Sequence, residues 1–169
     1  MISVLVVFWM YVILFAVIGS QRGWAKEVLV TFSIILALTL TTLLQSYIPF
    51  VRDVVAKQGA TFFWLRSIIL VVLVFFGYQT PNIARFAPKM TREKFQDTLL
   101  GIFLGALNGY LIVGSIWHYM DQAQYPFAII TKPATDLLIL KYLAPRLLGV
   151  PAVYFAVVVA FIFVIVVFI

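Results

Sequence analysis

The sequence predicts an all-α integral membrane protein with four core transmembrane helices and a fifth at the C-terminus. Hydrophobic residues make up 64% of its 169 residues and charged residues 11%, against about 45–50% and about 25% in a soluble domain. The mean hydropathy is +1.12. Apolar stretches of roughly 20 residues, the length that crosses a bilayer as a helix, recur along the chain. Residues 1–169 are therefore predicted to form a single transmembrane domain.

The five predicted spans cover residues 2–18, 25–44, 62–77, 99–120 and 151–169. The first is interpreted as a retained span, because no basic region precedes it and no small-residue cleavage pattern follows it. The short segment Gly19–Lys26 predicts a tight turn, so the first two helices are expected to form an antiparallel hairpin. Pro151 suits the first turn of the last helix.

Two shorter segments are predicted to be helices that lie in the membrane interface. Val51–Lys57 follows Pro49 and places Asp53 and Lys57 four residues apart, where they can form an ion pair on a helix. Asp136–Leu148 is apolar but too short to cross a bilayer.

Small residues recur every fourth position in two of the spans, which places them on one face of a helix. Such strips let helix backbones approach closely, and this is how helices associate in lipid. Both strips are therefore predicted to pack closely against other membrane helices, and an oligomer could form through the strip of the fourth span. The residues are Gly101, Gly105 and Gly109 in the fourth span, and Ala152, Ala156 and Ala160 in the fifth.

Two motifs resemble the signature regions of the colicin V production protein family, over roughly residues 1–121. The first motif contains Gly19, Arg22, Gly23 and Glu27, and the second contains Asp97, Gly101, Gly105 and Gly109. The resemblance implies a small multi-pass protein of the bacterial inner membrane that supports toxin production or export, or envelope homeostasis. Thr98 and Asn108 stand where that family usually has basic residues. Its members commonly have four spans, so the fifth is an addition.

The two motifs also resemble each other. Gly19-x-x-Arg22-Gly23-Trp24 and Gly105-x-x-Asn108-Gly109-Tyr110 share two glycines, a polar residue and an aromatic at equal spacing. Repeats with glycine-interrupted segments are how many transporters build a site near the bilayer midplane. A structural repeat and a chance similarity both account for the pattern.

The polar residues beside these glycines are the candidates for a conducting path. If the protein forms a homo-oligomeric conduit, Arg22, Asp97 and Asn108 are the predicted lining. For Arg22, Lys26 and Glu27 two interpretations stay open. They form either a cluster at a pore mouth that attracts anions, or an interfacial anchor with Lys26 and Glu27 in solvent.

Two further side chains are unusual for a membrane span. Arg66 lies about a turn inside the third span, where a charge is costly, so it must either extend to the interface or find a partner such as Asp97 or Asp53. His118 is the sole histidine and a weak candidate ligand for a metal, haem or pigment. An interfacial histidine among aromatic residues is the simpler interpretation.

Several functional classes are disfavoured. The net charge of +6 comes from basic residues between the apolar segments and not from a patch, so nucleic acid is not an expected partner. No paired carboxylates, nucleophile motif or phosphate loop indicates an enzyme, and no cofactor or metal is expected. The alternative to the family's function is a non-catalytic accessory subunit of a larger membrane bioenergetic complex, packed through its small-residue helix faces.

Overall fold

The computed structural model describes residues 3–49, 51, 59–79, 94–127, 137–147, 149 and 152–168. Each regular element in these ranges is a helix, and the prediction of an all-α protein is confirmed. The helices are α1 (Val4–Arg22), α2 (Trp24–Tyr47), α4 (Ala60–Tyr78), α5 (Lys94–Gln122), α6 (Leu137–Tyr142), α7 (Ala144–Leu147) and α8 (Ala152–Phe168). The predicted helix over Val51–Lys57, with its pair Asp53 and Lys57, lies almost wholly outside the described residues.

Four helices, α1, α2, α4 and α5, are long and apolar enough to cross a membrane. The sequence predicted their positions, although α5 extends several residues beyond the expected 99–120. Its 29 residues give a helix about 43 Å long, longer than the hydrocarbon core of about 30 Å. At 17 residues, α8 coincides with the predicted fifth span.

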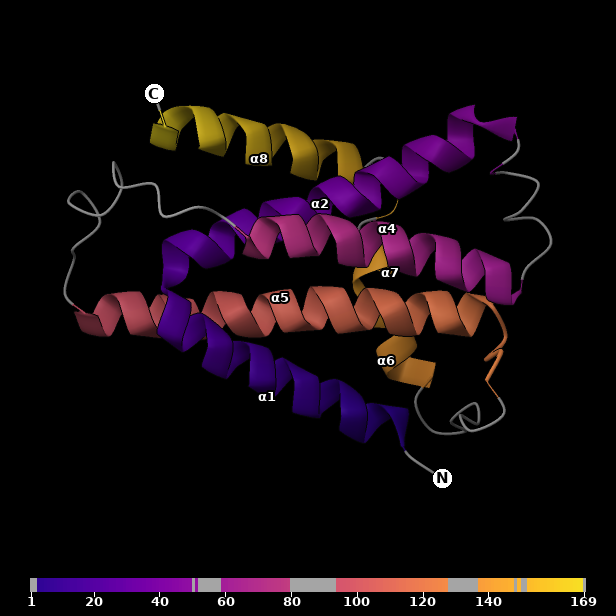
Figure 1. Cartoon of the computed structure of the whole chain (residues 1–169), viewed down its shortest axis with the longest axis horizontal. Coiled ribbons are helices and arrows are strands. Elements are labelled where there is room, and N and C mark those ends of the chain that lie inside the picture. The colour runs from indigo at the N-terminus through magenta and orange to yellow at the C-terminus, as the bar shows by residue number, and fades with distance from the viewer. Residues whose placement is uncertain are drawn as a thin grey trace.

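The long helix α5 lies at the centre of the bundle. It contacts α1, α2, α4 and α7, and Figure 1 shows α1 on one side of it with α2 and α4 on the other. As predicted, α1 and α2 run in opposite directions from a tight turn (Figure 1). The two helices diverge from their shared turn, because α1 packs mainly on the glycine face of α5.

The turn between α1 and α2 is a single residue, shorter than the predicted Gly19–Lys26. Gly23 has φ +83°, and its N–H donates to the carbonyl of Gly19. A backbone angle in this range suits glycine, which has no Cβ. At its other end, α2 stops at Tyr47 because Ile48 is extended ahead of Pro49, where a following proline disfavours the helical conformation.

The segment predicted as one interfacial helix over Asp136–Leu148 is two short helices that pack against α5. Leu143 and Ala144, at the break between α6 and α7, are buried. The hydroxyl of Tyr110, near the middle of α5, donates to the carbonyl of Tyr142. The apolar side chains at this break are therefore covered by the bundle, and the interfacial placement of the segment stays a prediction.

The last helix, α8, packs along α2. Figure 1 shows that α8 begins beside the middle of α2 and runs toward the end of the bundle where α1 meets α2. Ala152, Ala156 and Ala160 are half-buried, whereas Tyr154 and Phe155 are exposed. The alanine strip thus lies on the more covered side of α8.

Candidate functional site

The glycine strip of α5 is the surface on which α1 lies. A Cβ added at Gly105 would lie 2.9 Å from the Cα of Gly19 and would collide with the backbone oxygen of Phe15. A Cβ at Gly101 would collide with the backbone oxygen of Gly19, and one at Gly109 would lie 3.1 Å from the Cα of Val12. The backbones of α1 and α5 are therefore in contact, and both helices supply glycine to make this possible.

This packing confirms that Gly101, Gly105 and Gly109 make a close helix contact, and it identifies the partner as α1 of the same chain. The physical reason is that Gly19 offers α5 an equally smooth surface on the same chain, at no cost of association. A contact between copies through this strip would require α1 to leave it.

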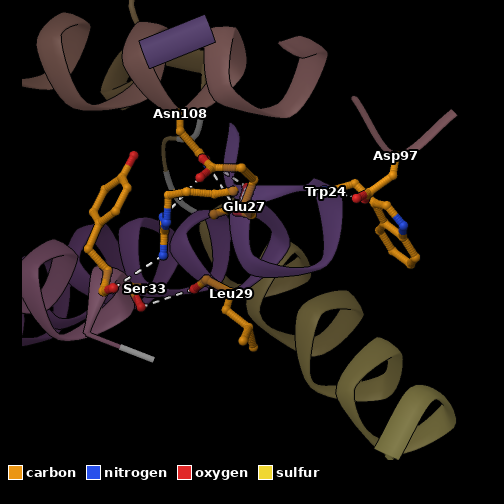
Figure 2. Close-up of polar contacts among 9 residues, drawn as sticks. Trp24, Glu27, Leu29, Ser33, Asp97 and Asn108 are labelled. Carbon is orange, nitrogen blue, oxygen red and sulfur yellow. Dashed lines mark hydrogen bonds and ion pairs between the residues drawn. The ribbon is translucent and has the colours of Figure 1, made fainter. Parts of the chain in front are cut away.

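The two sequence motifs meet at a buried carboxylate, that of Glu27. Its side chain is fully buried. The guanidinium of Arg22 donates to Glu27 Oε1 at 2.9 Å, and the side-chain amide of Asn108 donates to Oε2 at 2.8 Å. Asn108 also donates to the backbone carbonyl of Glu27 at 2.9 Å. Figure 2 shows Asn108 reaching from α5 to Glu27.

Most of the other polar atoms of this cluster also have partners, whereas the buried hydroxyl of Tyr78 has none among the described residues. Thr31 Oγ1 lies 2.7 Å from Asn108 Oδ1 and 3.1 Å from the carbonyl of Glu27. A hydroxyl has one proton, so the shorter contact to Asn108 is its better donor bond. Arg22 also donates to the carbonyl of Tyr78 at 3.2 Å and stacks over the ring of Tyr78 at 4.3 Å. The Arg22–Glu27–Asn108 cluster is thus neutral overall and joins α1, α2, α4 and α5.

Asp97, the first polar residue of the second motif, acts at a separate point. Its Oδ1 accepts the backbone N–H of Trp24, at the N-terminus of α2, at 3.1 Å. Gly23, the residue that precedes α2, has no side chain to cap it. The carboxylate satisfies one of the free N–H groups of the first turn and complements the positive end of the helix dipole. Asp97 therefore caps α2 from another helix (Figure 2).

The three residues predicted to line a conduit are therefore not gathered in one place. Arg22 and Asn108 both bind Glu27, and Asp97 binds the N-terminus of α2. Of the two interpretations of the first motif, an anchor with Glu27 in solvent is wrong, because Glu27 is fully buried, while Lys26 is exposed. The two motifs also do not form a structural repeat at their matching glycines. Gly23 forms the turn after α1, whereas the corresponding Gly109 lies within the continuous helix α5.

Arg66 lies beside the ends of α2 and α5, and His118 lies inside the bundle. Arg66 does not contact Asp97; it donates to the side-chain oxygens of Gln122, at 2.6 Å, and Gln45. Asp53, the other proposed partner, lies outside the described residues. His118 is not an exposed interfacial residue, because it is only 4% exposed within the bundle. In the part of the chain that the structure describes, no three metal-ligating side chains lie together.

Sequence reasoning missed three residues of this region. Thr31 and Tyr78 complete the Glu27 cluster, but a threonine inside a span and an aromatic at its end carry no distinctive signal. Gly77 of α4 packs on α2, where an added Cβ would lie 2.8 Å from Ser33 Cβ. The available signal in the sequence was a glycine within the apolar run of the third span.

Comparison with known protein families gives one match. The sequence profile of the colicin V production protein family matches residues 5–127, which contain both motifs and every residue of the Glu27 cluster. The match supports a role in toxin production. Neither a curated protein nor a solved structure matches the chain. With a family profile matched over most of its length and with four helices able to span a membrane, the chain belongs to the colicin V production protein family.

Proposed function

We propose that this protein supports the production or export of a toxin, or envelope homeostasis, as a non-enzymatic component of the bacterial inner membrane that packs beside other membrane helices. The observation that carries the proposal is how the polar groups of the two family motifs are used. Arg22, Glu27 and Asn108 bind one another, and Asp97 caps α2. These groups hold the bundle together, and this favours a packing role over a conducting path through one chain.

The outer surface of the bundle supports the same proposal. The faces that α1 and α4 turn outward are broad and apolar, as membrane-embedded surfaces for lipid or for neighbouring helices must be. Their exposed side chains are aliphatic or aromatic: Val6, Trp9, Met10, Ile13, Leu14 and Val17 in α1, and Trp64, Ile68, Val71, Val72, Phe75 and Phe76 in α4. A water-filled path between copies is expected to need polar groups on such a face.

A role without catalysis is supported by the state of Glu27. It is the fully buried carboxylate among the described residues, and both of its oxygens already accept hydrogen bonds from Arg22 and Asn108. A general acid or base must lie within hydrogen-bond reach of a substrate proton. Glu27 is instead directed at neighbouring helices.

The proposal is tested by isolating the protein from native membranes in mild detergent and measuring the mass of its assemblies. Single copies bound among unrelated membrane proteins would support the packing role and identify the partners. Purified protein in liposomes should pass no small ion under voltage or osmotic stress. Ion flux that is lost in Asn108→Leu but retained in the surface variant Lys26→Gln would overturn the proposal in favour of a homo-oligomeric conduit.

A further inference from the structure

At the end of the bundle where α2 and α5 finish, Arg66 has no acidic partner in the part of the chain that the structure describes. Arg66, in the second turn of α4, is partly buried, and its guanidinium contacts two neutral amide oxygens and two aromatic rings. The oxygens belong to Gln45 and Gln122, and the rings of Phe62 and Tyr119 lie 4.2 and 5.3 Å from the guanidinium carbon. Among the described residues, nothing accepts a hydrogen bond from the buried Arg66 Nε.

The acids that the structure describes are all engaged elsewhere. Glu27 pairs with Arg22, Asp97 caps α2, and Asp121 pairs with Arg146 at 3.5 Å. A charge in a membrane span is costly unless it is paired or reaches the interface. Rings and amide oxygens reduce that cost, but they bring no negative charge. Among the described residues, Arg66 therefore has no acidic counterion.

The glutamine amides beside Arg66 carry donor groups in addition to the oxygens that accept from Arg66. A guanidinium has five N–H groups, and the two glutamines bind through one terminal nitrogen each. Because each glutamine uses its oxygen to accept from Arg66, its NH₂ group remains able to donate. An arginine flanked by amide donors is suited to the paired oxygens of a phosphate or carboxylate.

The depth of this cluster indicates where such an anion comes from. Gln45 lies two residues before the end of α2, and Gln122 is the last residue of α5. Figure 1 shows these two helix ends at the same end of the bundle. In a bilayer this is the level at which helices leave the hydrocarbon and meet the headgroups. We propose that Arg66, Gln45 and Gln122 form a binding site for a singly charged phosphate group, supplied by an anionic phospholipid headgroup or by free phosphate.

The test measures lipid binding to the full chain in detergent by native mass spectrometry, with phosphatidylglycerol and phosphatidylcholine as probes. We expect the wild type to bind phosphatidylglycerol about tenfold more tightly. Arg66→Gln should abolish the preference, and Gln45→Leu and Gln122→Leu should each weaken it. Lys26→Gln, which removes an exposed cation elsewhere, should leave it unchanged and so controls for general attraction of anionic lipid.

Further arms separate the sources of the anion and guard against misfolding. Millimolar inorganic phosphate that displaces phosphatidylglycerol and raises the melting temperature as much as the lipid does would identify free phosphate as sufficient. If Arg66→Gln does not fold, the two glutamine variants report on the site. The proposal is overturned if the wild type shows no preference, or if Arg66→Gln and Lys26→Gln retain it equally. It is also overturned if Asp53→Asn or Asp136→Asn destabilises the protein as Arg66→Gln does, because the counterion is then internal.

Discussion

Asn108 donates its side-chain amide to both the carboxylate and the backbone carbonyl of Glu27, a residue 81 positions earlier in the chain. This pair connects the two family motifs, since Glu27 belongs to the first and Asn108 stands one residue before the last glycine of the second. The family usually has a basic residue at the position of Asn108. The amide of Asn108 supplies donors to Glu27 without adding a positive charge to the Arg22–Glu27 pair.

Removing the charge of Glu27 should destabilise the bundle. Glu27→Gln leaves Arg22 with no negative partner, and we expect a loss of about 3 kcal/mol in unfolding free energy, as for other buried pairs broken on one side. Unfolding in mixed detergent micelles, followed by tryptophan fluorescence, measures it. Because the two residues form one pair, the double variant Arg22→Gln, Glu27→Gln should cost clearly less than the sum of the single variants. Strict additivity would contradict the pairing.

Asn108 should be sensitive to a change that keeps its shape. Asn108→Asp replaces the NH₂ group that lies 2.8 Å from Glu27 Oε2 with a carboxylate oxygen. Two carboxylates at this distance repel each other, so the variant should be less stable at pH 8 than the wild type by about 2 kcal/mol. Thr98→Val, at an exposed position of α5, is the matched control and should remain near wild type. Equal stability of both variants would show that the amide is not needed.

A methyl group on the glycine strip should separate α1 from α5. Gly105→Ala places a Cβ against the backbone of Phe15 and Gly19, and overpacking of this kind costs about 1–3 kcal/mol. Gly59→Ala is the control, because nothing lies within 4 Å of a Cβ there. The chain has no cysteine, so spin labels on introduced cysteines in α1 and α5 can report the separation. A change in assembly mass without loss of stability would mean that the strip serves contact between copies.

The cap on α2 should be measurable by itself. Asp97→Ala removes the acceptor of the Trp24 N–H and should cost about 1 kcal/mol, as for other N-caps, whereas Asp97→Asn, which keeps an acceptor oxygen, should cost less. Gln96→Ala, at the exposed neighbouring position, is expected to be neutral. Hydrogen exchange at the first turn of α2 should rise in Asp97→Ala alone. Unchanged exchange there would contradict the capping role.

If α8 crosses the membrane as the predicted fifth span, the chain crosses the membrane five times and its two ends lie on opposite sides. Figure 1 places the N-terminus and the end of α8 at opposite ends of the bundle, so tags at the two termini should report opposite sides of the membrane in protease-protection assays. Tags on the same side would contradict a fifth crossing by this segment. Ala156→Leu should loosen α8 from α2, whereas Val158→Leu, on the exposed side of α8, should not.

The sequence by itself determined the class, the family and the approximate position of the long helices. Hydropathy fixes these features, because a stretch of about 20 apolar residues has few alternatives to a helix in lipid. It also indicated where backbones approach closely, through the spacing of Gly101, Gly105 and Gly109. Gly23 was predicted within a turn, although its positive φ, which makes it the whole turn, was not apparent from spacing.

The tertiary structure alone decided which surfaces and charges meet. Periodicity shows that a strip is smooth but not which helix covers it, so the partner of Gly105 became Gly19 of the same chain only once α1 and α5 were placed. Glu27 follows a basic residue at a span end, and this pattern predicts a solvent-exposed side chain. It is buried instead, because Arg22 of α1 and Asn108 of α5 both bind its carboxylate. The free-energy cost of burying a polar side chain in the membrane depends on its hydrogen-bond partners. Because those partners are distant in the sequence, only the packing of the helices shows which ones meet.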